Sequence, residues 1–182
     1  MRIRSIVPAA LLAVALALTG CTSSGGGGGS GAGKAPTVLP VSANPIKNTS
    51  STPGLEITYA AVQDNEDPGT RKPLGDMLEL TLKNTSDKKL AKFEAYYEMK
   101  DTKTKATEAY YQDLGDLSLD PGAETTIYFD NGTGTGHYPE NKFSVYRSST
   151  NQIDFQIQVS ADGVAVATAK ASKDPGTGEK VD

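Results

Sequence analysis

The sequence has too few cysteine and histidine residues for several classes of chemistry. Its 182 residues include one cysteine, Cys21, one histidine, His137, and no tryptophan. A lone cysteine cannot form an intrachain disulfide, and zinc needs three or four clustered His, Cys or carboxylate ligands. A serine or cysteine nucleophile needs an adjacent base, for which His137 is the only imidazole. We therefore expect a protein that is not an enzyme and that holds no cofactor.

Basic charge and long hydrophobic runs are scarce as well. The chain has 18 Lys and Arg against 22 Asp and Glu. Nucleic acids and anionic lipid headgroups are bound by positive fields, so this acidic balance argues against a nucleic-acid partner and against electrostatic adhesion to membranes. The longest apolar run, residues 6–18, has about 13 residues, fewer than the roughly 20 that a spanning helix needs. A permanent transmembrane helix is therefore not expected.

Residues 1–20 have the three parts of an export signal. Arg2 and Arg4 form a positive start, the apolar run follows, and small residues precede Cys21. The run ends in Leu18-Thr19-Gly20-Cys21, which resembles the lipobox of bacterial lipoproteins. That resemblance implies cleavage before Cys21 and a lipid on its sulfur, which would anchor the protein on the extracytoplasmic side of a cell membrane. The alternative is an ordinary signal peptide that leaves Cys21 as a free thiol.

Composition divides the remaining chain into a linker, a domain and a tail. Residues 21–53 are rich in Gly, Ser, Pro and Thr, and such segments do not bury enough apolar surface to offset their ordering entropy. We expect them to form a disordered tether. Residues 54–172 have the length of a single domain. Residues 173–182 are predicted to form a disordered tail.

Apolar and polar residues alternate through most of residues 54–172. Leu78, Leu80 and Leu82, for example, are separated by polar residues. Period two with one polar face is typical of antiparallel strands that pack on one side. Turn sequences such as Asp120-Pro121-Gly122 separate the runs, so the pattern predicts a single all-β antiparallel sandwich of about seven or eight strands. The predicted strands are 55–62, 78–83, 91–100, 107–114, 124–129, 142–146, 153–159 and 164–171.

Residues 88–111 permit a second interpretation. They are rich in helix formers, and a helix would place Leu90, Phe93 and Tyr97 on one face. Over residues 91–100, however, apolar and polar residues alternate for ten positions. We therefore favour a strand.

Three motifs resemble those of small immunoglobulin-like domains found in bacterial lipoproteins. One strand ends in Lys83-Asn84-Thr85-Ser86, the next ends in Tyr96-Tyr97-Glu98, and Leu119-Asp120-Pro121-Gly122 leads into a further strand. Domains of this kind, often catalogued as FxLYD-type or telokin-like, have no assigned function. The resemblance spans residues 55–171 and implies an immunoglobulin-like sandwich without catalytic residues. The paired cysteines of some of these domains are absent here.

Polar loops offer weak candidates for ligand binding. His137 follows a Gly-rich stretch and is predicted to lie in a surface loop. Calcium needs only oxygen ligands, but neither acidic cluster of the sequence follows EF-hand spacing, and acidic turn residues are usually solvated. The two candidate clusters are Asp64, Glu66 and Asp67, and Asp130, Asn131 and Glu140.

A tyrosine hairpin is the most specific candidate for recognition. If the strands over residues 91–114 pair as a hairpin, Tyr97 lies opposite Tyr110 and Tyr96 lies opposite Tyr111. Tyr97 shares the apolar face, so Tyr96 and Tyr111 are predicted to be exposed. Exposed aromatic residues are enriched at recognition surfaces, which makes this pair the candidate interaction patch. The alternative is a cross-strand pair that only stabilises the hairpin.

Together these features predict a membrane-anchored, non-enzymatic interaction or accessory module of the cell envelope, with an envelope protein or glycan as its partner. Two alternatives stay open. One is a calcium- or small-ligand-binding sensor or carrier, and the other is an envelope hydrolase that acts through carboxylates.

Overall fold

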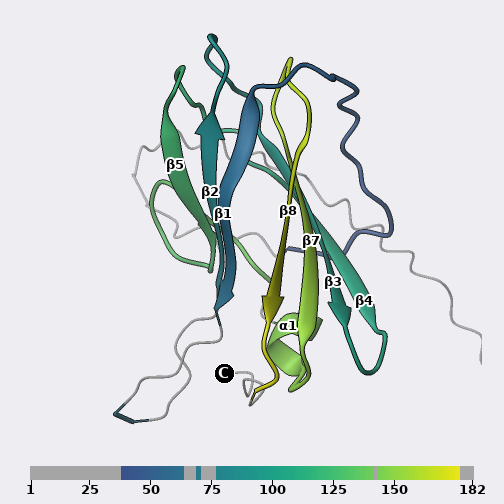
Figure 1. Cartoon of the computed structure of the whole chain (residues 1–182). Coiled ribbons are helices and arrows are strands. Elements are labelled where there is room, and N and C mark those ends of the chain that lie inside the picture. The colour runs from purple at the N-terminus through teal and green to yellow at the C-terminus, as the bar shows by residue number, and fades with distance from the viewer. Residues whose placement is uncertain (1–37, 64–68, 71–76, 142, 177–182) are drawn as a thin grey trace, which may run out of the picture. The chain divides into compact units, whose positions relative to one another are not determined.

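Two four-stranded sheets form the domain in a computed structural model that describes residues 38–63, 69–70, 77–141 and 143–176 (Figure 1). No helix in the described part of the chain has the length and hydrophobicity needed to cross a bilayer. The elements are β1 (Leu55–Gln63), β2 (Met77–Asn84), β3 (Glu94–Asp101), β4 (Thr107–Asp113), β5 (Glu124–Phe129), β6 (His137–Tyr138), α1 (Val145–Ser148), β7 (Ile153–Ser160) and β8 (Ala167–Lys173).

The strand order confirms the predicted sandwich. One sheet has the order β1-β2-β5-β6 and the other has the order β4-β3-β7-β8. All pairs are antiparallel except the short pair of β5 and β6, which is parallel. The neighbours β1-β2-β5 have the positions of strands A-B-E in an immunoglobulin-like sandwich, and the neighbours β3-β7-β8 have the positions of strands C-F-G. The strand predicted over residues 91–100 is also confirmed, and the helical alternative for residues 88–111 is wrong.

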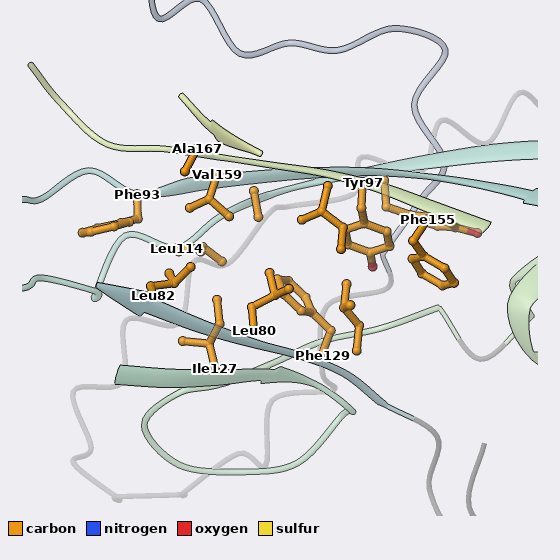
Figure 2. Close-up of a cluster of buried hydrophobic side chains, with 14 of the residues drawn as sticks. Leu80, Leu82, Phe93, Tyr97, Leu114, Ile127, Phe129, Phe155, Val159 and Ala167 are labelled. Carbon is orange, nitrogen blue, oxygen red and sulfur yellow. The ribbon is translucent and has the colours of Figure 1, made fainter. Parts of the chain in front are cut away.

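Alternating burial explains why these segments form strands. In β2, Leu78, Leu80 and Leu82 are at most 2% exposed, while the residues between them are half-buried. β7 shows the same pattern, because Ile153, Phe155, Ile157 and Val159 are buried. In Figure 2, side chains of both sheets meet in one layer, where burial of each large aliphatic or aromatic side chain contributes about 1.5–3 kcal/mol. This layer is the core that holds the two sheets together.

The strand predicted over residues 142–146 is wrong. Val145 and Tyr146 are neighbours in sequence and both are buried, which a strand with one solvent face does not allow. A turn begins where the Phe143 N–H donates to Asn141 Oδ1 at 3.0 Å, and the single helical turn of α1 follows it. Both side chains thereby reach the core from one short segment.

The predicted tether from Cys21 to Pro53 is too long at its C-terminal end. Its residues 38–53, which we call the strap, form hydrogen bonds with the domain, and Val38 is buried in the core cluster. Asparagine side chains contribute to this, since Asn44 and Asn48 bond to side chains of β7. The tether predicted before the strap lies outside the described residues.

The predicted tail also begins too early. Lys173 ends β8 and is only 1% exposed, because its Nζ donates to the carbonyls of Tyr146 at 2.9 Å and Ser149 at 2.7 Å. These carbonyls lie at the C-terminal end of α1, where a cation is favoured. Gly176 N–H further donates to Thr150 O at 3.2 Å, so the ordered domain continues past residue 172.

Candidate functional site

A cleft of about 510 Å³ lies between the strap and one end of the β4-β3-β7 face, and we call it the strap cleft. Strap residues form one wall, and the start of β3, the end of β4 and the end of β7 form the rest. Both signs of charge are present. The lining residues are Pro45, Lys47, Asn48, Lys92, Glu94, Asp113, Gly115, Ser160, Ala161 and Asp162.

The strap reaches this position along a defined path. The Val41 N–H donates to Ala109 O on β4 at 2.8 Å, and Asn44 Nδ2 donates to Gln158 Oε1 on β7 at 2.8 Å. Because β3 lies between β4 and β7, the strap crosses over the outer face of β3 (Figure 1). It then continues to Thr52, whose carbonyl accepts a bond from the Ala165 N–H at 2.7 Å.

Asn48 is the main polar contact of the strap beside the cleft. Its Nδ2 lies 3.0 Å from Ser160 Oγ, 3.0 Å from Ala161 O and 2.8 Å from Val164 O. Its Oδ1 accepts a bond from the Ser50 N–H at 2.9 Å, which forms a local Asx turn. This role was not predicted from the sequence, although an asparagine two residues before a serine is a turn signal of this kind.

Two carboxylates lie side by side on the strand wall of the cleft. Glu94 and Asp113 are register partners of β3 and β4, and alternation places both side chains on the outer face. Directly opposed like charges destabilise a strand pair, and the Tyr111 hydroxyl offsets part of this by donating to Glu94 Oε1 at 2.5 Å. That hydrogen bond, followed by burial and the neighbouring carboxylates, raises the pKa of Tyr111 to about 12.

An ion pair closes the cleft at the β7–β8 turn. Lys92 Nζ lies 2.9 Å from Asp162 Oδ2, and Lys92 itself has a left-handed backbone with φ of 54°. The hydrogen bond between them raises the pKa of Lys92 and lowers that of Asp162. Both side chains are largely exposed, so solvent screens this pair and it contributes little to stability.

Two further charged groups of the cleft are open to a partner. Lys47 on the strap and Asp113 at the end of β4 are exposed, and in the part of the chain that the structure describes neither forms a hydrogen bond or an ion pair. A charged group that is already solvated and unpaired can bond to a partner without breaking an internal contact. The cleft therefore offers one cation and one anion for recognition.

The tyrosine hairpin has the predicted register but not the predicted exposure. Tyr97 pairs with Tyr110 and Tyr96 pairs with Tyr111, which confirms the hairpin. Tyr111 is half-buried, but Tyr96 is only 9% exposed, so the prediction of an exposed pair is wrong. The strap covers Tyr96 because it crosses β3 between its bonds to β4 and to β7. Burial and the nearby Glu98 carboxylate raise the pKa of Tyr96.

The described calcium candidates are engaged with other side chains. Both Asp130 carboxylate oxygens lie within 3.1 Å of His137 Nδ1, and Glu140 Oε2 lies 2.8 Å from an Arg147 guanidinium nitrogen. Asn131 Oδ1 accepts a bond from the Glu140 N–H at 2.9 Å. No cluster of three or more metal-ligating side chains occurs within the described ranges. The other candidates, Asp64, Glu66 and Asp67, lie outside the described residues.

His137 is not in the surface loop that the sequence predicts. It begins β6, pairs with Tyr128 of β5 and stacks on that ring with a centroid distance of 5.2 Å. The glycine-rich segment before it allows the chain to turn back from β5 and pair with it as β6, because Gly134 and Gly136 adopt φ of 106° and 85°. His137 thus packs on the outer face of the β1-β2-β5-β6 sheet, whereas the strap cleft lies on the β4-β3-β7-β8 sheet.

Comparisons with known proteins identify no family. No family model and no curated protein matches the sequence. One similar solved structure is the alkylpurine DNA glycosylase AlkC of Pseudomonas fluorescens, with 17% identity, a TM-score of 0.36, and coverage of 66% of this chain and 31% of that chain. Another is the sporulation control protein Spo0M of Bacillus subtilis, with 9% identity, a TM-score of 0.35, and coverage of 68% and 50%. The chain thus spans at most half the length of either protein.

Proposed function

We propose that this chain is a lipid-anchored protein on the extracytoplasmic side of a bacterial membrane, and that its sandwich is a non-enzymatic interaction module of the cell envelope. The lipobox-like sequence Leu18-Thr19-Gly20-Cys21 supports the anchor. The observation that carries the binding role is the strap cleft, where Lys47 and Asp113 are exposed and unpaired among the described residues.

The chemistry of the cleft favours a polar partner. Small apolar ligands are usually held in enclosed, mostly apolar pockets, whereas this cleft is open and bordered by five charged side chains. Charged groups at the rim of an interface set the orientation and the association rate of a partner more than its affinity. The cleft therefore suits a hydrophilic protein segment or a glycan of the envelope.

A carboxylate-dependent envelope hydrolase is the second candidate. It is favoured by the register pair Glu94 and Asp113, because two opposed carboxylates are the minimum that glycoside hydrolysis requires. A Glu94→Gln variant separates the two functions. Turnover of an envelope glycan by the unaltered protein, lost in this variant, would support the hydrolase, whereas partner capture without any turnover supports the interaction module.

Photo-crosslinking in native membranes tests the binding role. A photo-crosslinking amino acid at Asp113 is expected to capture a discrete partner. The matched control is the same amino acid at Tyr59, which is 50% exposed on β1 in the other sheet. Equal crosslinking at both positions, or none at Asp113, would contradict a binding role for the cleft.

Membrane retention tests the anchor. A Cys21→Ser protein is expected to be released from the membrane or to stay unprocessed, because the lipid is carried by the sulfur atom. The folded domain should be unchanged, as judged by its circular dichroism. If the Cys21→Ser protein were processed and stayed on the membrane after a high-salt wash, the lipid anchor would be wrong.

A further inference from the structure

β4 is an edge strand, and among the described residues its outward backbone groups form few hydrogen bonds. It ends the order β4-β3-β7-β8, whereas β8 at the other end lies beside β1 (Figure 1). Since Ala109 O bonds to the strap, alternation points the N–H and C=O groups of Thr107, Ala109, Tyr111 and Asp113 away from β3. Such an edge is a template for another extended chain.

β4 lacks several of the features that protect an edge, although Glu108 places a charged side chain on its inner face. Its sequence, Thr-Glu-Ala-Tyr-Tyr-Gln-Asp, has no proline and no lysine. The paired residues of β3 and β4 follow each other from Glu94 and Asp113 to Lys100 and Thr107 in a continuous register without a bulge. Apart from Glu108, protection of this edge depends on the segments that lie against it.

The strap lies against this edge but uses little of it. Pro40 forms an isolated bridge with Tyr110, and among the described residues the only backbone bond of normal geometry between the two segments runs from Val41 N–H to Ala109 O. Proline has no N–H, so Pro40 itself donates nothing to the edge. An extended peptide with free N–H groups can form more bonds along Thr107–Asp113 than the strap does.

The strap end at this edge is held mainly by one side chain. Val38 is 8% exposed and belongs to the core cluster, whereas the next residue, Leu39, is 69% exposed. Pro40 is exposed and Val41 is half-buried. Among the described contacts, residues 38–41 can therefore leave the edge at the expense of one buried valine, the Pro40–Tyr110 bridge and its one regular backbone hydrogen bond, while the Asn48 contacts farther along remain.

The charged side chains beside the edge indicate which kind of peptide would fit it. Glu94 and Asp113 face each other at one end of the outer face, and Glu98 lies opposite Ala109 in the middle. Lys100 is at the far end, opposite Thr107, and Lys47 of the strap borders the cleft at the acidic end, so acidic side chains predominate among the strand residues of this face. Alternate side chains of a docked strand would lie over this outer face. Basic side chains at those positions complement it.

We propose that the edge of β4 is a docking site for an extended peptide with basic side chains at alternate positions, and that strap residues 38–41 leave the edge to admit it. This inference rests on the proposed interaction module and assigns its mode of recognition. The peptide adds a strand to the sheet, so backbone hydrogen bonds supply affinity and the acidic outer face supplies specificity.

Fluorescence anisotropy on the full chain in a non-ionic detergent tests this docking mode. The probe is a labelled octapeptide of alternating valine and lysine, and the control probe alternates valine and glutamate. In a Val41→Cys, Ala109→Cys protein, a disulfide can hold the strap on the edge of β4. Val41 and Ala109 share a backbone hydrogen bond, and the Cα atoms of such hydrogen-bonded antiparallel pairs are about 5.5 Å apart, which is within disulfide range. The lysine peptide should bind the reduced protein and should lose at least about tenfold in affinity after oxidation, a loss of about 1.4 kcal/mol.

A second pair of variants separates strap release from loss of folding. Val38→Ser removes the buried anchor and should tighten lysine-peptide binding, by up to about tenfold, since more of the protein has an open edge. Leu39→Ser is the matched control and should bind like the unaltered protein, because that side chain is already exposed.

Three outcomes would overturn the docking mode: equal binding by the oxidised and reduced proteins, equal binding of the two peptides, or no binding of the lysine peptide by Val38→Ser. Crosslinking at Asp113 in native membranes would survive each of these outcomes if the domain binds its partner in another way. Failure of the docking mode is therefore distinguishable from failure of the proposed function.

Discussion

Both sheets have a tyrosine on the outer face, but the two faces differ in what covers them. Tyr59 on β1 is 50% exposed, whereas Tyr96 on β3 is 9% exposed, although both lie in strands and point away from the core. Ala109 and Ser160, also on the outer face of the β4-β3-β7-β8 sheet, are 9% and 2% exposed. The strap accounts for the difference, because it crosses this sheet between its bonds to β4 and to β7.

The domain therefore has two kinds of buried residue. Residues of the inner faces are buried because the sheets pack on each other, and apolar side chains are required there. Tyr96 lies under a segment whose described hydrogen bonds to the sheet come from its backbone and from asparagine side chains. The first kind of burial should be costly to disturb and the second kind should be cheaper, and three measurements rank them.

Truncation of an inner-face residue should have the largest effect, and it should be similar in both sheets. Ile157→Ala on β7 and Leu80→Ala on β2 each empty a site that is at most 1% exposed. Each should lower the free energy of unfolding by about 2 to 5 kcal/mol, measured by urea denaturation. Lys83→Ala on the outer face of β2 is the control and should change it by about 0.5 kcal/mol or less. A large loss for only one of the two core variants would mean that the sheets do not share one core.

The inner faces were predictable because period-two alternation depends only on neighbouring residues. Leu78, Leu80 and Leu82 illustrate this, and so does the tyrosine hairpin, whose register follows once its two strands are paired. The turn at Gly122 was also predictable from the sequence Asp120-Pro121-Gly122, since glycine tolerates the φ of 74° that it adopts there. Local patterns therefore specified the sandwich and most of its strands.

The candidate site was not predictable in the same way, because it depends on contacts between distant segments. Asn48 bonds to Ala161, 113 residues away, and nothing in the Pro- and Ser-rich composition around it signals this contact. Tyr96 was assigned the right face, but its exposure depends on the strap. His137 was placed in a loop because its two-residue strand is too short to show a period.

Release of the strap should have an intermediate effect on stability. Asn48→Ala removes the donor that serves Ser160, Ala161 and Val164, which are all at most 4% exposed. The free energy of unfolding should fall by about 1 to 3 kcal/mol, the usual penalty for leaving buried acceptors without a donor. Thr49→Ala, at the exposed neighbouring position, should be nearly neutral. If Asn48→Ala matched Thr49→Ala in urea denaturation, the strap would not be held by these bonds.

The smallest effect is expected at the rim of the strap cleft, and it should depend on pH. Tyr111→Phe keeps the ring and removes only the hydrogen bond to Glu94, so it should cost about 0.5 to 1.5 kcal/mol at pH 8. The hydrogen bond raises the pKa of Tyr111 to about 12, against about 10 for an unfolded tyrosine. The folded state thus holds this proton more tightly, and its stabilising contribution is complete below pH 10 and is lost as the pH rises to 12.

The free energies of unfolding of the unaltered protein and Tyr111→Phe should therefore converge between pH 10 and pH 12. Other groups that titrate in this window are shared by both proteins, so they largely cancel in the difference. Urea denaturation at several pH values measures it. A difference that stayed constant up to pH 12 would show that the Tyr111 hydroxyl stabilises the hairpin by packing rather than by its bond to Glu94.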